Sequence, residues 1–132
     1  MAEHPNVARL KKGYDAFASG DLDALKGLFA DDILWHVPGN NPLAGDYKGQ
    51  DEVFGFFAKI AQETGGTFKL ELHDVLANDE HAVVLVRVSA ERNGKRLDGE
   101  PGVQVFHTNP DGKTTEFWGF SQDSAKIDEF WS

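Results

Sequence analysis

Residues 20–39 constrain the fold more tightly than any other stretch of this sequence. Gly20 is placed to end a first helix, because glycine adopts the left-handed conformation in which many helices stop. Asp21 can then cap a short second helix through its side-chain oxygen. Residues 33–37 follow as a strand, which Pro38 ends because proline has no N–H to donate to a sheet. Two helices leading directly into a strand are typical of an α+β domain, in which helices pack on one face of a sheet.

Helical and strand periodicities divide the rest of the chain. Apolar residues recur at helical spacing between Val7 and Phe17, with Asn6 as the expected cap. A third helix begins near Gln50 and ends at Gly65-Gly66. From there the period is two, and four strands joined as an antiparallel meander are expected. These strands span residues 67–76, 81–91, 95–108 and 113–120. The third is expected to contain a bulge near residues 99–102. Asn93-Gly94 is a strong signal for a hairpin turn between the second and third strands.

The order of these elements predicts the fold class. A short last helix after Asp123 completes a series of helix, helix, strand, helix and four strands. A curved antiparallel sheet wrapped around three N-terminal helices leaves a hollow inside, and such a hollow is the usual site for a ligand. The predicted fold is therefore an α+β cone with an internal apolar pocket.

The composition excludes several classes of partner. A chain of 132 residues is long enough for one domain with its own core, here residues 1–132. Its net charge is −9 and it has no basic run, so neither nucleic acid nor an anionic membrane is an expected partner. Without cysteine it has no disulfide, thiolate chemistry or sulfur metal site.

The first residues lack the apolar segment of a signal peptide, and the apolar run 82–86 is too short to span a bilayer. We therefore expect a soluble, cytoplasmic protein.

Several short motifs resemble those of a known superfamily. They are Gly20-Asp-Leu-Asp23, Leu28-Phe-Ala-Asp-Asp32, Gly49 before the third helix, and Asp111-Gly-Lys113 ahead of the last strand. In this order and spacing they resemble the NTF2-like superfamily, and within it the SnoaL-like and ketosteroid-isomerase-like domains, over nearly the whole chain. The resemblance implies the cone and its pocket. It leaves the activity open, because the superfamily places isomerases, cyclases, hydrolases, dehydratases and non-catalytic binders on one scaffold.

The catalytic positions of ketosteroid isomerase are not kept in this sequence. That enzyme pairs an Asp base with an oxyanion hole made of Tyr and a protonated Asp. By the resemblance, the base position holds Val37, which cannot transfer a proton. The Tyr position holds Gly13, one residue before Tyr14, and the second Asp position holds Gln104, which can still donate a hydrogen bond. Steroid isomerisation by that mechanism is therefore not expected.

His36 is the candidate catalytic base, because imidazole titrates near neutral pH and His36 adjoins the family's base position. The alternative is a histidine at a strand end that is hydrogen-bonded to the loop of residues 38–49. Strand alternation, counted from the base position, turns Trp35 and Val37 into the cone and His36 onto the outer face.

Aromatic residues are abundant, with ten Phe and three Trp, and they either fill a core or line a cavity. Alternation in the strand 95–108 turns Gln104, Phe106 and Thr108 inward and His107 outward. Together with the family's positions, this predicts a pocket lined by Tyr14, Phe17, Trp35, Val37, Phe57, Gln104, Phe106 and Trp131. No cofactor is expected in it.

The histidines form no recognisable metal motif. No pair has His-x-His or His-x-x-x-His spacing, so no metal is predicted. His73 and His107 lie in strands that could be neighbours, and a long-range site that adds His36 is the one arrangement left open.

The outer face of the predicted sheet carries exposed aromatics. Trp118 and Phe120 alternate onto the same side, and such a patch usually marks an interface, so we expect a homodimer through the sheet. Arg87, Ser89 and Glu91 share one face of an aliphatic strand. They are either a polar wall of the pocket or, as we favour, part of the outer face, where Arg87 pairs with a carboxylate.

Three functions fit this pattern. The first is a cofactor-independent isomerase, cyclase or hydrolase of a polyketide- or terpenoid-like compound, with His36 as base and Tyr14 or Gln104 as hydrogen-bond donor. The second is a binder of an apolar small molecule without catalysis, since Val37 and Gln104 replace both carboxylates. The third is a protein-interaction module, which requires a filled cavity and a second partner.

Overall fold

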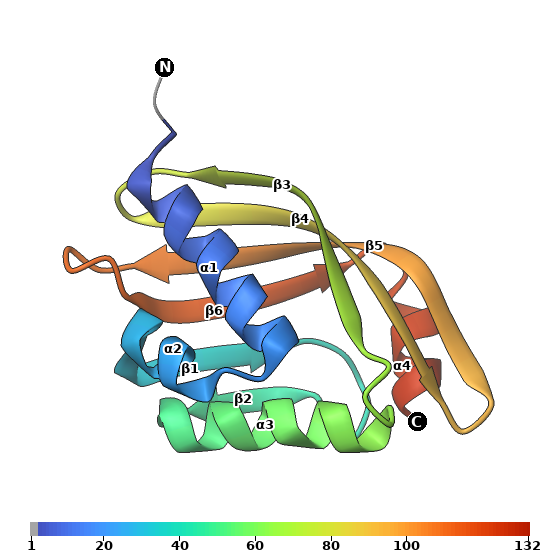
Figure 1. Ribbon diagram of the computed structural model, residues 1–132. Helices are drawn as coiled ribbons and strands as arrows, with labels where there is room; N and C mark the ends of the chain where they lie inside the picture. The colour runs from blue at the N-terminus through green and yellow to red at the C-terminus, as the bar shows by residue number, and fades with distance from the viewer. Residues whose placement is uncertain (1–2) are drawn as a thin grey trace.

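The computed structural model describes residues 3–132 as four helices and one six-stranded sheet (Figure 1). The helices are α1 (Pro5–Ser19), α2 (Leu22–Leu28), α3 (Gly49–Glu63) and α4 (Ser124–Trp131). The strands are β1 (Phe29–Val37), β2 (Gly45–Lys48), β3 (Lys69–Ala77), β4 (His81–Arg92), β5 (Lys95–Thr108) and β6 (Thr114–Ser121). Across the sheet the strands follow the order β2-β1-β6-β5-β4-β3.

The helix ends largely follow the signals in the sequence. Gly20 ends α1 with φ 72°, and the Asp21 carboxylate accepts a hydrogen bond from the Ala24 N–H at 3.1 Å at the start of α2. The predicted Asn6 cap of α1 is wrong. Pro5 already occupies the first helical turn, so the cap falls on His4, whose Nδ1 accepts from the Asn6 N–H at 3.1 Å.

The strands β3 to β6 form the predicted antiparallel meander, and Asn93 and Gly94 have the positive φ angles of a tight hairpin turn. A register shift between Val88 and Ala90 places the predicted bulge in β5, where Gly99 has φ 66°. One pairing differs from the prediction, because β1 runs parallel to β6. The chain leaves β2 through α3 to the far edge of the sheet, and the meander returns β6 beside β1 in the same direction.

The region predicted as a loop between residues 38 and 49 contains the short strand β2. It pairs antiparallel with β1 and brings Asp46 opposite His36 and Tyr47 opposite Trp35. Strand β2 has four residues, begins with Gly45 and is followed by Gly49. It is too short to show the alternation of apolar and polar residues by which a strand is recognised in a sequence.

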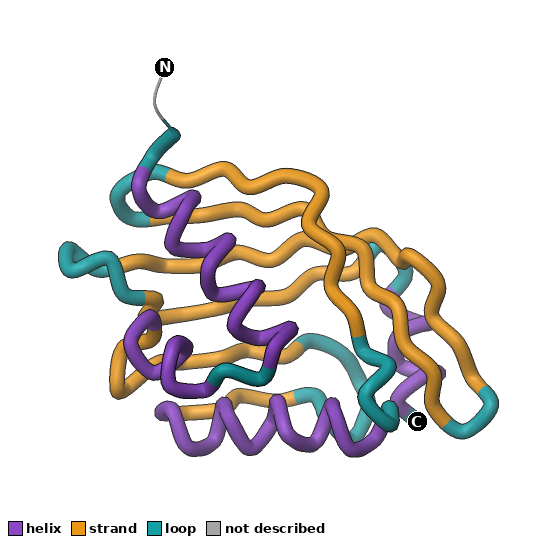
Figure 2. The backbone as a smooth tube through the Cα atoms, in the orientation of Figure 1, coloured by secondary structure: helices purple, strands orange, loops and turns teal. Residues whose placement is uncertain are grey.

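The sheet curves, and its strands β3, β4 and β5 bend partway along their length (Figure 2). Helix α3 packs on β1 and β2, α1 packs on β3, and α4 packs on β5 and β6. Ile33, Val53 and Val84 lie between these layers with no exposed surface. The α+β cone predicted from the sequence is thus confirmed. No helix of residues 3–132 is long and apolar enough to cross a membrane.

Candidate functional site

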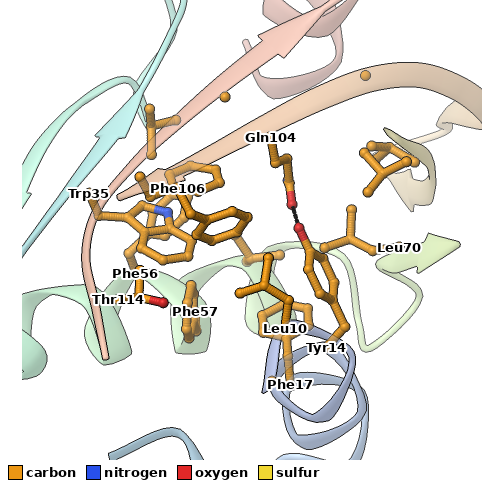
Figure 3. Close-up of a pocket in the computed structure, with 18 of the residues that line it drawn as sticks. Leu10, Tyr14, Phe17, Trp35, Phe56, Phe57, Leu70, Gln104, Phe106 and Thr114 are labelled. Atoms are coloured by element: carbon orange, nitrogen blue, oxygen red, sulfur yellow. Dashed lines mark hydrogen bonds between the residues drawn. The ribbon is translucent and has the colours of Figure 1, made fainter. Parts of the chain in front are cut away.

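A cavity of about 190 Å³ lies between α1, α3, α4 and the concave face of the sheet (Figure 3). All eight residues predicted to line a pocket contribute to its wall. They are Tyr14, Phe17, Trp35, Val37, Phe57, Gln104, Phe106 and Trp131. The predicted alternation also agrees with the structure, because Trp35 and Val37 line the cavity and His36 does not.

Aromatic rings form one wall of the cavity. Trp35 of β1 stacks on Phe117 of β6, with 3.8 Å between ring centroids and 13° between ring planes. Phe57 of α3 meets the indole edge-on at 5.2 Å, and Phe106 of β5 lies 5.3 Å from Phe117. Figure 3 shows the rings of Trp35, Phe57 and Phe106 gathered on one side of the cavity. Because each comes from a different element and contacts its neighbours, the wall is fixed by the packing of the core.

A polar pair stands opposite this wall. The Tyr14 hydroxyl of α1 donates a hydrogen bond to Oε1 of Gln104 on β5, the dashed line in Figure 3. Burial raises the pKa of the Tyr14 phenol, so the hydroxyl keeps its proton. Since Oε1 is already engaged, Gln104 can offer its NH₂ group to an acceptor in the cavity. The pair can therefore hold a carbonyl, ether or hydroxyl oxygen of a ligand.

His36 lies on the outer face of the sheet, away from the cavity. Its Nδ1 is 2.7 Å from Oδ1 of Asp46, its Nε2 is 2.6 Å from Oε2 of Glu116, and its ring stacks on Trp118 at 5.5 Å. The hydrogen bond to Asp46, and then the one to Glu116, raises the pKa of His36. Both ring nitrogens are engaged on this face, so the structure gives His36 no route to a molecule in the cavity.

The pH dependence of stability tests this arrangement. The folded state raises the pKa of His36 above its unfolded value of about 6.5. The pairing therefore stabilises the fold fully below that pH and loses its contribution as pH rises through the folded-state pKa. We expect an NMR titration of His36 to show a raised pKa that falls in Asp46→Asn. We also expect urea unfolding of His36→Gln to lose this part of the pH dependence. An unchanged His36 pKa in Asp46→Asn would contradict the arrangement.

The other histidines and the polar stripe of β4 lie outside the cavity. The predicted proximity of His73 and His107 is wrong, since β4 separates their strands; His81 instead lies beside His107, with ring centroids 4.5 Å apart. No cluster of three metal-binding side chains occurs within residues 3–132. Arg87 is exposed and donates to the Gly99 carbonyl at 3.3 Å rather than to a carboxylate.

Many residues of the cavity wall were not predicted from the sequence, and three polar ones among them bear on ligand binding. Asn6 and Arg9 lie on the first turns of α1, and Thr114 begins β6. Arg9 follows Asn6 by three residues and precedes Gly13 by four, so the three residues share one face of the helix. This spacing is the sequence pattern that could have placed Asn6 and Arg9 at the cavity. It is weak, because polar residues near a helix start usually face water.

The fold and cavity define a class of protein, a curved-sheet cone that encloses an aromatic-lined cavity. A family model described as a SnoaL-like domain matches residues 10–117, and the chain belongs to this family. The uncharacterized protein Rv0034 of Mycobacterium tuberculosis is 35% identical over 133 residues and aligns over the whole of both chains.

Solved structures agree with this assignment. Bal32a, from a soil-derived mobile gene cassette, is 38% identical with a TM-score of 0.91 over 96% of both chains. An NTF2-like protein from Burkholderia pseudomallei has a TM-score of 0.85 at 22% identity, over 98% of this chain and 99% of that one, and supports the fold alone.

Proposed function

We propose that this protein binds one compact, largely apolar small molecule in the cavity between α1, α3 and the sheet. The observation that carries the proposal is the aromatic wall of Trp35, Phe57, Phe106 and Phe117 facing the polar pair Tyr14–Gln104. A mostly apolar concave site with a few convergent polar groups is the usual form of a small-molecule site. The volume of about 190 Å³ is below the roughly 300 Å³ at which drug-sized pockets begin, so the ligand has about one or two rings. A small polyketide- or terpenoid-like compound fits this description.

The lining favours binding without turnover. Among the described residues, 3–132, the lining contains no Asp, Glu, His or Lys, and Val37 stands at the family's base position. General acid–base catalysis needs a group that exchanges its proton near the working pH. Tyr14, with its raised pKa, is a poor base, and an arginine cannot be deprotonated in a protein.

A neutral two-ring probe tests the proposal. We expect 2-naphthol to bind saturably, to change the fluorescence of Trp35 or Trp131, and to be recovered unchanged by mass spectrometry. Leu70→Trp, which adds bulk to the cavity wall, should abolish binding. Leu76→Trp is the matched control, since Leu76 is 54% exposed and does not line the cavity. Thermal unfolding confirms that both variants fold. Binding that survives Leu70→Trp in the folded protein would place the ligand elsewhere.

A second candidate function is catalysis at the same site. The Tyr14 hydroxyl lies in a cavity of low polarity, where a hydrogen bond to a substrate carbonyl is stronger than in water. It could polarise that carbonyl during isomerisation, cyclisation or hydrolysis, without cofactor. Recovery of a transformed product would establish this function, and loss of turnover in Tyr14→Phe would assign the donor. The protein-interaction module predicted as a third alternative is disfavoured, because it requires a filled cavity.

We also propose that the outer face of the sheet forms a homodimer. Trp118 and Phe120 of β6 lie beside Val105 and Val103 of β5 on this face, and Phe120 is 57% exposed. Adjacent apolar rows on an uncovered sheet face are typical of such an interface. Sedimentation equilibrium should give twice the chain mass for the native protein and the chain mass for Trp118→Glu. The proposal would be overturned if the native protein sediments with the mass of one chain even at a protein concentration 100-fold higher than in the 2-naphthol binding experiment.

A further inference from the structure

The cavity wall contains one charged side chain among the described residues, Arg9. Arg9 is also part of the wall of a second, polar cleft at the surface, between the start of α1 and the β3–β4 and β5–β6 turns. Asn6, Thr108 and Gly112 are shared by both walls in the same way. Arg9 therefore stands where the cavity meets the solvent-filled cleft, at the end of the cavity near the start of α1.

This end of the cavity is polar, in contrast to the aromatic wall. Four polar residues of the described chain are buried, and three of them, Asn6, Thr108 and Thr114, line the cavity. Within residues 3–132 every fully buried side-chain oxygen or nitrogen has a hydrogen-bond partner. The side-chain hydrogen bonds of these described residues include none from the hydroxyl of Thr108 or Thr114, so neither hydroxyl is fully buried. Both hydroxyls are thus accessible from the space that they line and can donate to a ligand.

The guanidinium of Arg9 is held in place but not neutralised. Its Nη1 donates to Oδ1 of Asn6 at 2.6 Å, and Asn6 is fixed in turn by its bond to the Asn78 carbonyl at 3.0 Å. A Cβ on Gly112 would overlap the Arg9 guanidinium, so the missing side chain at Gly112 leaves the room that the guanidinium occupies. None of the ion pairs within residues 3–132 includes Arg9. Asp79 and Glu80 line the same surface cleft, but no carboxylate of residues 3–132 pairs with the remaining N–H groups of Arg9.

We propose that the ligand of this cavity is a carboxylic acid whose carboxylate binds Arg9 while its apolar body lies against the aromatic wall. This rests on the proposed function and names the ligand class. A guanidinium matches a carboxylate with two parallel hydrogen bonds, and the Thr108 hydroxyl adds a donor beside it. The net charge of −9 repels anions at long range, so the preference for a carboxylate comes from Arg9 locally.

Two ligands of nearly equal shape, one a carboxylate and one a neutral amide, measure how much the negative charge of the ligand contributes to binding. We expect 1-naphthoate to bind about tenfold more tightly than 1-naphthamide at pH 7.5 and low salt, a moderate gain because Arg9 is exposed to solvent. The Arg9→Gln variant should bind the two ligands equally, within about twofold, because the glutamine side chain keeps hydrogen-bond donors at this position but has no charge. Arg9→Lys should keep part of the preference. Arg96→Gln is the control, since it changes the net charge equally at an exposed position outside the cavity. Benzoate and benzamide repeat the comparison with a smaller body.

The outcomes separate this inference from the proposed function. If the neutral amides bind but the acids gain nothing, or the gain survives Arg9→Gln, the carboxylate assignment is wrong and the small-molecule site stands. If neither acids nor amides of either size bind while 2-naphthol does, this inference is wrong and the proposed function stands. If 2-naphthol does not bind either, the proposed function fails and this inference falls with it. A tenfold preference that Arg9→Gln removes and Arg96→Gln leaves intact supports both.

Discussion

Replacing Phe130 by alanine is expected to destabilise the fold by about 3–5 kcal/mol, the usual cost of deleting a buried aromatic ring. Phe130 is 1% exposed and its ring meets Trp131 edge-on at 4.9 Å, at the end of α4. Arg92 donates to the Phe130 carbonyl at 3.1 Å, which holds this end of the helix against the sheet. Removing the ring leaves a void in the core, and the cost of that void adds to the loss of buried apolar surface.

The matched control is the same substitution at Phe120. Phe120 also borders the cavity, but the residue is 57% exposed, so Phe120→Ala should change the free energy of unfolding by no more than about 0.5 kcal/mol at protein concentrations where the chain is monomeric. Urea unfolding at one fixed protein concentration measures both, because the midpoint falls with stability while the slope stays constant. Equal effects of the two substitutions would mean that the Phe130 ring is not part of the stabilising core.

The fold was predictable because its boundaries have local physical causes. Gly20 and Asp21 mark a helix end and a helix start by conformations and hydrogen bonds that involve only neighbouring residues. Asn93-Gly94 sets a hairpin in the same way. The parallel pairing of β1 with β6 has no such signal, because it follows from where the meander ends in space. Short β2 is likewise held by its partner strand rather than by its own residues.

The candidate site likewise has features that local sequence patterns predict and features that depend on residues distant in the sequence. Strand alternation is local, and counted from the base position that the family resemblance supplied, it placed Trp35 inside and His36 outside correctly. The partners of His36 were not predictable, because Asp46 and Glu116 reach it from two other strands, 10 and 80 residues away. Arg9 was missed for a related reason. A cation on an amphipathic helix, like Lys11 and Lys12 of the same helix, is normally a solvent-facing side chain. Only the folded structure shows that Arg9 lies against Gly112 of the β5–β6 turn and also borders the cavity.

The polar pair of the cavity gives a prediction about energetic coupling. Tyr14→Phe leaves Oε1 of Gln104 without its donor, and Gln104→Leu leaves the Tyr14 hydroxyl without its acceptor. Each single change is expected to cost about 1–3 kcal/mol, the penalty for an unsatisfied polar group in a buried place. The double change Tyr14→Phe with Gln104→Leu removes both groups. It should cost less than the sum of the two by about 0.5–3 kcal/mol, since neither group is then left unpaired.

The only other tyrosine in the chain provides the control for this cycle. The Tyr47 hydroxyl donates to the Leu43 carbonyl at 2.7 Å and has no bond to Gln104, so Tyr47→Phe and Gln104→Leu should add. Additivity for Tyr14 and Gln104 as well would show that the two groups do not depend on each other. In that case the Gln104 amide would be free to turn, and the cavity would lose the fixed NH₂ donor on which recognition of a ligand oxygen depends. Coupling at Tyr14 alone would mean that the donor is oriented before any ligand arrives, as a site that selects by hydrogen bonding requires.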